Sequence, residues 1–349
     1  MSGKTTERCT IIVSPRDRFS TAESCLETLV ANTPEPYDLI IVMGGAPQAL
    51  RERLQARFAG KAKLIFIPQF LNCAQARNIG LREAKTRLSL CMDSDVFVRP
   101  GWLSALIRCQ EETGAGLVVP LMLENQHAIH TAGNSFFITQ KGGKPFGSKV
   151  LPYHGQEVHE GTNIKRAPAD YGEMHCQLVD TKAALDLGVY DERIREGEEL
   201  DSGLTWKKGG KSIWFEPESI VVFDFPTSID SAEDISLFIW RWDFHGIMEG
   251  YKVFHEKWGI DITENGAFKH FLLMLNELVG ILPRLWPSQT ALRIDHALNR
   301  GGEILGLPIK AWRHLRAWRW GYYDWVRELE GGPSPARAFK EKARGILRT

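Results

Sequence analysis

The fold is decided by one stretch, Leu88 to Pro100, which reads Leu-Ser-Leu-Cys-Met-Asp93-Ser-Asp95-Val-Phe-Val-Arg-Pro. Its apolar first half predicts a buried strand. Asp93 and Asp95 follow at the end of that strand, and because they are two apart they project to the same side. Two like charges so close repel unless a proton or a cation lies between them. The stretch therefore predicts a divalent cation that holds a phosphate, although such acid pairs also occur in turns and on surfaces.

The composition is that of an ordinary globular protein. The 349 residues are 43% hydrophobic and 25% charged, which predicts about two domains with a sizeable core. The 43 basic and 43 acidic side chains balance to zero formal net charge. This balance argues against a surface for nucleic acid.

The cysteines and the apolar segments predict a cytoplasmic protein. The 6 cysteines form no C-x-x-C pair, so we expect reduced, buried thiols. The polar amino-terminal residues show no signal peptide. The longest apolar stretch, Phe271 to Leu282, includes Asn276 and Glu277 and is too short and too polar to cross a membrane.

Apolar runs alternate with helical periodicity through the first 120 residues, which predicts an α/β fold with a mostly parallel sheet. The predicted strands are 10–13, 39–42, 64–67, 88–92 and 117–119. Ser20 and Glu23 are spaced as in a capping box at the start of the first helix. Asp93 and Asp95 fall between a strand and the next helix, which is where open α/β sheets bind ligands.

The remainder of the chain is less regular. Residues 136–144 predict a β-hairpin, residues 183–187 a short helix, and 212–215 and 220–223 two strands. An acid-rich segment lies between, at 195–204. Beyond Asp230 the sequence is helical and rich in tryptophan and arginine. We therefore predict a catalytic domain at 1–228 and a helical carboxyl-terminal region at 229–349.

Several ordered motifs resemble those of the family 2 glycosyltransferases, inverting enzymes of the GT-A fold that use nucleotide-sugar donors. The resemblance covers roughly the first two-thirds of the chain. The matching segments are Ile11 to Arg16, Asn72 to Gly80 (Asn-x-x-x-x-Arg-Asn-x-Gly), Asp93-Ser94-Asp95, Tyr190-Asp191-Glu192 and Gly197 to Leu204 (Gly-Glu-Glu-Leu-Asp-Ser-Gly-Leu).

The resemblance assigns roles to particular residues. It implies Mn²⁺ or Mg²⁺ as the cofactor, with Asp95 as the leading ligand and Asp93 as a ribose or metal residue. It places the catalytic base at Glu199, with Glu198 as a possible substitute. A general base typically contributes a factor of about 10² to 10⁴. The remaining implied roles are donor binding by Pro15, Arg16, Arg77, Asn78 and Asp93, metal binding also by Asp224, and acceptor binding by Glu173 and His175.

Three departures from the family pattern leave alternatives open. The family's nucleobase-binding acid is replaced by the Met43-Gly44 segment, and its usual Asp base is Glu199. The family's histidine ligand after the last strand is matched here by Asp224. A sugar-nucleotide-binding protein without catalysis is therefore the alternative to an active transferase. A nucleotidyltransferase is disfavoured, because Ser14 to Asp17 lacks the glycine-rich loop that such enzymes carry after the first strand.

The resemblance also implies a setting. The expected acceptor is a saccharide or a lipid-linked saccharide, in the assembly of a surface polysaccharide. Aromatic and apolar residues from Trp312 to Leu329 share a helical face flanked by basic residues. That helix is a candidate for peripheral contact with the inner face of a membrane. Packing against the catalytic domain or a second subunit is the preferred alternative.

Overall fold

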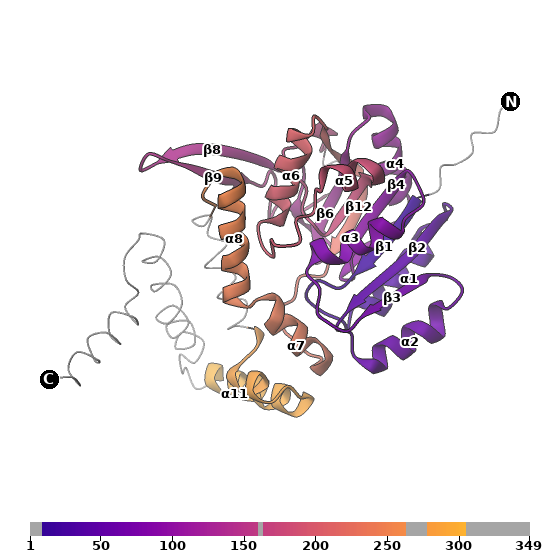
Figure 1. The fold of residues 1–349 in the computed structure, drawn as a ribbon. Helices are drawn as coiled ribbons and strands as arrows, with labels where there is room; N and C mark the ends of the chain where they lie inside the picture. Colours follow the sequence, from indigo (N-terminus) through magenta and orange to yellow (C-terminus); the bar gives the residue numbers. More distant parts are fainter. Residues whose placement is uncertain (1–8, 160–162, 263–277, 305–349) are drawn as a thin grey trace. The chain divides into compact units, whose positions relative to one another are not determined.

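The computed structural model describes residues 9–159, 163–262 and 278–304 (Figure 1). The described residues divide into two compact units. The first unit comprises those within Met1–Pro226 and Ser236–Asn265, and the second comprises those within Thr227–Ile235 and Gly266–Thr349. This division differs from the predicted boundary after residue 228. Residues 236–262 group with the first unit because Arg241 pairs with Glu196 and Lys257 pairs with Asp201.

A ten-stranded sheet forms the centre of the first unit, in the order β10-β12-β6-β11-β4-β1-β2-β3, with β5 beside β12 and β7 beside β6 (Figure 1). Strands β1, β2, β3 and β4 are parallel neighbours, and β11 runs antiparallel to both β4 and β6. The predicted mostly parallel α/β sheet is thus confirmed. The strands are Cys9–Ser14 (β1), Tyr37–Gly44 (β2), Lys63–Ile67 (β3), Leu88–Asp93 (β4), Val96–Val98 (β5), Leu117–Glu124 (β6), Ala128–Thr131 (β7), Ala167–Pro168 (β10), Cys176–Asp180 (β11) and Ile213–Phe223 (β12).

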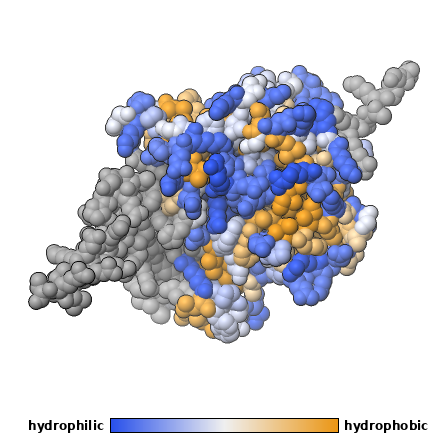
Figure 2. Space-filling view, in the orientation of Figure 1, coloured by the Kyte–Doolittle hydropathy of each residue, from blue (hydrophilic) through white to orange (hydrophobic). Residues whose placement is uncertain are grey.

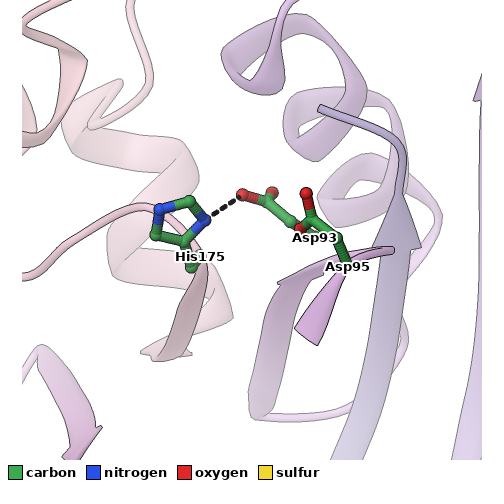
Figure 3. A group of neighbouring side chains, drawn as sticks. All are labelled: Asp93, Asp95 and His175. Carbon is green, nitrogen blue, oxygen red and sulfur yellow. Dashed lines mark ion pairs between the residues drawn. The ribbon is translucent and has the colours of Figure 1, made fainter. Parts of the chain in front are cut away.

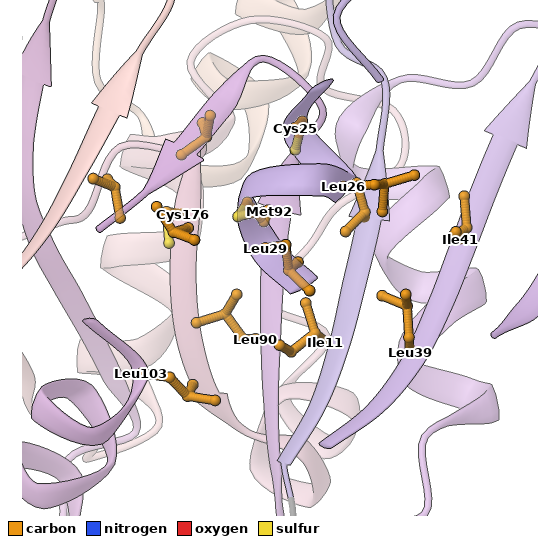
Figure 4. Close-up of a cluster of buried hydrophobic side chains, with 14 of the residues drawn as sticks. Ile11, Cys25, Leu26, Leu29, Leu39, Ile41, Leu90, Met92, Leu103 and Cys176 are labelled. Carbon is orange, nitrogen blue, oxygen red and sulfur yellow. The ribbon is translucent and has the colours of Figure 1, made fainter. Parts of the chain in front are cut away.

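Helices cover both faces of this sheet. Side chains alternate along each strand, so Ile11 and Val13 of β1 join one core while Ile12 joins the other. The first core includes residues of α1 (Ala22–Asn32), α2 (Gln48–Phe58) and α4 (Trp102–Thr113), and part of it is drawn in Figure 4. The second includes residues of α3 (Cys73–Glu83), α5 (Thr181–Leu187) and α6 (Glu198–Lys208).

Three local predictions have different outcomes. The hairpin is confirmed as β8 (Ser135–Lys141) and β9 (Lys144–Val150), which extend away from the main sheet (Figure 1). The two strands predicted at 212–223 are one strand, β12, whose pairing with β6 shifts between Glu216 and Ile220. The capping box at Ser20 is wrong, since α1 begins after Thr21 without a side-chain cap.

Two helices follow β12 in the chain, α7 (Ala232–Arg241) and α8 (Phe244–Trp258). The first four residues of α7 belong to the second unit, and the rest of α7 and all of α8 belong to the first. The second unit contains α10 (Ile281–Leu285) and α11 (Gln289–Ile304). There the Gln289 amide accepts from the backbone N–H of Ala232 at 3.0 Å. The membrane-facing helix predicted at 312–329 lies outside the described residues.

Burial and surface character agree with part of the composition argument. All six cysteines are buried free thiols. In the part of the chain that the structure describes, no helix is long and apolar enough to cross a bilayer. Figure 2 shows hydrophilic residues over much of one face, with separate hydrophobic areas between them.

Candidate functional site

The ends of four strands converge around Asp93 and Asp95. Asp93 is the last residue of β4 and lies opposite Ser14 of β1. Its backbone N–H donates to the carbonyl of His175, just before β11, at 2.9 Å. The backbone N–H of Asp224, just after β12, donates to the carbonyl of Asp95 at 3.0 Å. Backbone hydrogen bonds between elements distant in sequence therefore fix the acidic loop.

Asp93, Asp95 and His175, here called the Asp93 group, form a candidate metal centre (Figure 3). One ligand atom from each lies within 4.8 Å of the others, and all three side chains are buried. His175 Nδ1 is 3.1 Å from Asp93 Oδ2, and its ring stacks on Phe223 with centroids 4.0 Å apart. The carboxylate oxygens of Asp93 and Asp95 are ligands that suit Mn²⁺ or Mg²⁺.

The protonation of the Asp93 group also fits a cation. Burial raises the pKa of Asp95 well above its ordinary value, with the neighbouring Asp93 adding to the effect. Neither carboxylate oxygen of Asp95 has a hydrogen-bond partner among the described residues. Burial lowers the pKa of His175 to about 4, so the ring is neutral at pH 7, as a metal ligand must be. A divalent cation would supply the missing partner for Asp95.

Asp93 is held ionised by arginine. Burial acts to raise the pKa of Asp93, but the charge of Arg77 and the contact with His175 outweigh it and hold the pKa below its ordinary value. Arg77 on α3 is 0% exposed, and its Nη2 lies 3.0 Å from Asp93 Oδ1. The same nitrogen donates to the carbonyl of Met174. Arg77 thus orients Asp93, and its predicted contact with donor phosphates stays a prediction.

A second acidic cluster begins helix α6. Glu196, Glu198 and Glu199, here called the glutamate cluster, place one oxygen each within 4.8 Å of the others. Gly197 lies among them with φ of 82°, and a Cβ there would come within 2.8 Å of Ile262. Glycine is therefore required for the turn that brings these acids to the helix amino terminus, which favours negative charge.

Two arginines neutralise much of the glutamate cluster. Arg241 Nη2 lies 2.8 Å from Glu196 and 3.6 Å from Glu198. Arg16, just after β1, places Nη1 3.5 Å from Glu198 and 4.0 Å from Asp93. Arg16 therefore connects the glutamate cluster with the Asp93 group, as expected for a residue that also meets the charged part of a donor.

The pKa values of Glu198 and Glu199 are shifted in opposite directions. Burial raises the pKa of Glu198, whose Oε1 also accepts from the Cys73 thiol at 3.2 Å. Burial acts to raise the pKa of Glu199 too, but the charge and hydrogen bond of Lys149 outweigh it, so that pKa is lowered. Lys149 comes from β9, so the hairpin reaches the start of α6. Glu199 is accordingly an ionised carboxylate, the form in which a general base starts.

The other predicted site residues lie around these two clusters. Pro15 is buried directly after β1. The Asp224 carboxylate lies 3.1 Å from Arg18 Nη2. The Asn78 amide donates to the carbonyl of Tyr190 and to Glu192, both at 2.9 Å, so the structure does not bring it to the Asp93 group. Burial raises the pKa of Glu173, the first-named acceptor residue.

Sequence reasoning missed several members of the site. It identified neither Lys149 nor Arg241 as a partner of the acidic residues. It also missed the anchoring of α8 to α6, where Asp201 accepts from Trp258 Nε1 at 2.7 Å and pairs with Lys257 at 2.8 Å. The acid-rich segment 195–204 was the available signal, because so many buried acids require basic partners.

Comparisons with known proteins bear on the same region. Residues 10–160 match the family model for glycosyl transferase family 2. The pre-mycofactocin glycosyltransferases of two Mycobacterium tuberculosis strains are 28% identical over 163 residues, which cover 45% of this chain and 31% of theirs. The match thus spans about a third of the length of these curated relatives.

A solved structure has a similar fold. The crystal structure of GalNAc-T7 with UDP, GalNAc and Mn²⁺ superposes with a TM-score of 0.51 at 15% identity, over 79% of this chain and 55% of that one. At this identity the likeness concerns the fold alone. Residues 10–160 are thus similar to the family 2 glycosyltransferases, and the sheet with its antiparallel β11 and the structural likeness agree with a GT-A fold.

Proposed function

We propose that this chain is a metal-dependent, inverting glycosyltransferase that moves a sugar from a nucleoside diphosphate donor to an acceptor hydroxyl. One observation carries the proposal. The two carboxylate oxygens of Asp95 are buried beside Asp93 and His175, at the carboxyl end of the parallel strands, and no described residue hydrogen-bonds to them. Such a carboxylate is costly unless a cation or a proton joins it.

Asp95, Asp93 and His175 would hold the metal, which is Mn²⁺ or Mg²⁺. Asp224 remains a further proposed ligand, because its backbone is bonded to Asp95 although its carboxylate faces Arg18. When bound, the cation neutralises the charge that develops on the departing diphosphate. Arg16 is the proposed second contact for that charge, since its buried Nη1 has no hydrogen-bond partner among the described residues. Pro15 and Asn78 stay proposed as donor-binding residues.

Glu199 is the proposed base. It accepts the proton of the acceptor hydroxyl while that oxygen attacks the anomeric carbon and the bond to the nucleoside diphosphate breaks. One displacement of this kind inverts the anomeric configuration. Lys149 supports the role, because it keeps Glu199 ionised at neutral pH. Glu198 is the less suitable base, since Arg16 and Arg241 neutralise it and Cys73 bonds its Oε1.

The acceptor side is proposed more coarsely. Glu173 stays the candidate for acceptor binding, because its pKa is affected by both Lys149 and Glu199 and it therefore lies near the base. His175 was assigned to the acceptor from the sequence, but its contact with Asp93 favours the metal centre. The proposed acceptor is a saccharide, free or lipid-linked, in surface polysaccharide assembly. UDP-sugars are the first donors to test, since the solved relative in fold was crystallised with UDP and GalNAc.

Release of nucleoside diphosphate from a panel of UDP-, GDP- and dTDP-sugars with Mn²⁺ tests the proposal. The unaltered chain is expected to turn over at least one donor, and Asp95→Asn to lose most of that activity. Asp186→Asn is the matched control, because its side chain is 57% exposed and pairs only along α5 with Lys182. If one sugar nucleotide binds but none is turned over, the chain is a binding protein, which is the alternative from sequence.

A further inference from the structure

A cavity of about 480 Å³ lies between the start of α3, the loop ahead of α6 and helices α7 and α8. Its lining residues include neither the Asp93 group nor the glutamate cluster. Two of them nevertheless adjoin that cluster in the chain. Arg195 directly precedes Glu196, and Trp240 directly precedes Arg241, which pairs with Glu196. Asn72, also in the lining, precedes Cys73, whose thiol donates to Glu198. The cavity wall is therefore continuous in the chain with residues that contact the glutamate cluster.

Arg195 is built into the wall of this cavity. Its guanidinium lies over the Trp240 ring, 4.2 Å from the centroid, and Nη1 donates to the Trp240 carbonyl at 3.3 Å. A Cβ on Gly246 would come within 2.3 Å of that nitrogen, so this glycine lets the guanidinium lie against α8. Among the described residues no carboxylate lies within 4.0 Å of Arg195. Its remaining N–H groups are left for a ligand.

The other walls supply complementary groups. Glu249 of α8 is exposed, has no ion pair among the described residues and only accepts hydrogen bonds at neutral pH. Phe70 adds an apolar ring, with its centroid 5.6 Å from that of Trp240. By contrast, Arg193 and Glu192 are already engaged, by Asp191 and by Asn78 respectively. The cavity therefore offers a fixed donor at Arg195, an acceptor at Glu249 and apolar ring surface.

We infer that this cavity binds a saccharide unit of the acceptor, adjacent to the unit whose hydroxyl reacts. The inference rests on the proposed function. Sugar hydroxyls both donate and accept, so one ring satisfies Glu249 and Arg195 together, and its C–H groups contact the aromatic rings. A phosphate or another anion fits less well, because Glu249 would repel it. A nucleoside is the competing ligand for an aromatic cavity of this size.

Saturation-transfer NMR of the full chain, without donor or metal, tests the inference. The probes are cellobiose, lactose, mannobiose and diacetylchitobiose, with uridine as the competing class. We expect at least one disaccharide to bind. Glu249→Gln should weaken it about tenfold or more, because a hydrogen bond to a charged group is worth about 1.5 to 3 kcal/mol. Glu256→Gln, an exposed glutamate on the same helix, should bind as the unaltered chain does.

Each outcome decides the question. Binding by none of the disaccharides overturns the inference, as does equal binding by Glu249→Gln and Glu256→Gln. Uridine binding that Glu249→Gln weakens, without disaccharide binding, makes the cavity a nucleoside site. Since Arg195→Gln disturbs packing on Gly246, it serves only as a second variant. Because donor and metal are absent, a chain that fails to turn over any sugar nucleotide still reports disaccharide binding, so the two proposals fail separately.

Discussion

Replacing Arg77 by methionine should destabilise the first unit strongly even when no donor or metal is present. Arg77 and Asp93 are both 0% exposed, and the substitution leaves the Asp93 carboxylate buried without its main counter-charge. Removing one partner of a buried ion pair costs about 3 to 5 kcal/mol. We expect the lower end, about 3 kcal/mol, because His175 and Arg16 still lie 3.1 and 4.0 Å from Asp93.

Urea unfolding at pH 7, followed by tryptophan fluorescence, measures this loss. The matched control is Arg82→Met on the same helix, since Arg82 is 56% exposed and 3.7 Å from Glu192. Such an exposed pair is worth about 0 to 1 kcal/mol. Asp93→Asn combined with Arg77→Met should be less destabilised than the sum of the single variants. Additive losses, or equal losses for the Arg77 and Arg82 variants, would refute the assignment of Arg77 as the counter-charge of Asp93.

Three further predictions concern the start of α6. Lys149→Met removes the group that lowers the pKa of Glu199, so the acid limb of the pH profile of kcat/KM for sugar transfer should move to higher pH; an unmoved limb would exclude Glu199 as the base. Gly197→Ala should lower the thermal midpoint clearly, because φ there is 82° and Ile262 leaves no room for a Cβ. Trp258→Phe removes the donor to Asp201 and should cost about 1.5 to 3 kcal/mol in urea unfolding, whereas a cost under 0.5 kcal/mol would show that this bond does not anchor α8.

The fold was largely predictable because its signals are local. Buried parallel strands read as continuous apolar runs, and β1, β2, β4 and β6 lie where such runs occur. The edge strand β3, which is only partly buried, also lies at an apolar run. The position of Asp93 and Asp95 at the end of β4 followed from the same pattern. The break predicted between 212–215 and 220–223 is wrong, since β12 continues through it with a shift in its pairing with β6.

The charged partners of the site could not be predicted in the same way. Lys149 pairs with Glu199 although they are 50 positions apart in the chain. The hairpin register places Lys149 on β9 opposite Phe136, and no local sequence pattern encodes that approach. Arg241 likewise pairs with Glu196 because residues 236–265 belong to the same compact unit as Glu196. The sequence identified the acidic residues of the site. The fold was needed to identify the lysine and arginine side chains that pair with them.

Manganese binding to Asp95 tests the central claim most directly. Mn²⁺ titrations followed by electron paramagnetic resonance, with and without UDP, compare the unaltered chain with Asp95→Ala and with Asp186→Ala as the exposed control. The account predicts one Mn²⁺ site whose affinity falls about 10- to 100-fold or more in Asp95→Ala, since even residues that only orient a ligand cost that much. Equal Mn²⁺ affinity in Asp95→Ala and Asp186→Ala would contradict it.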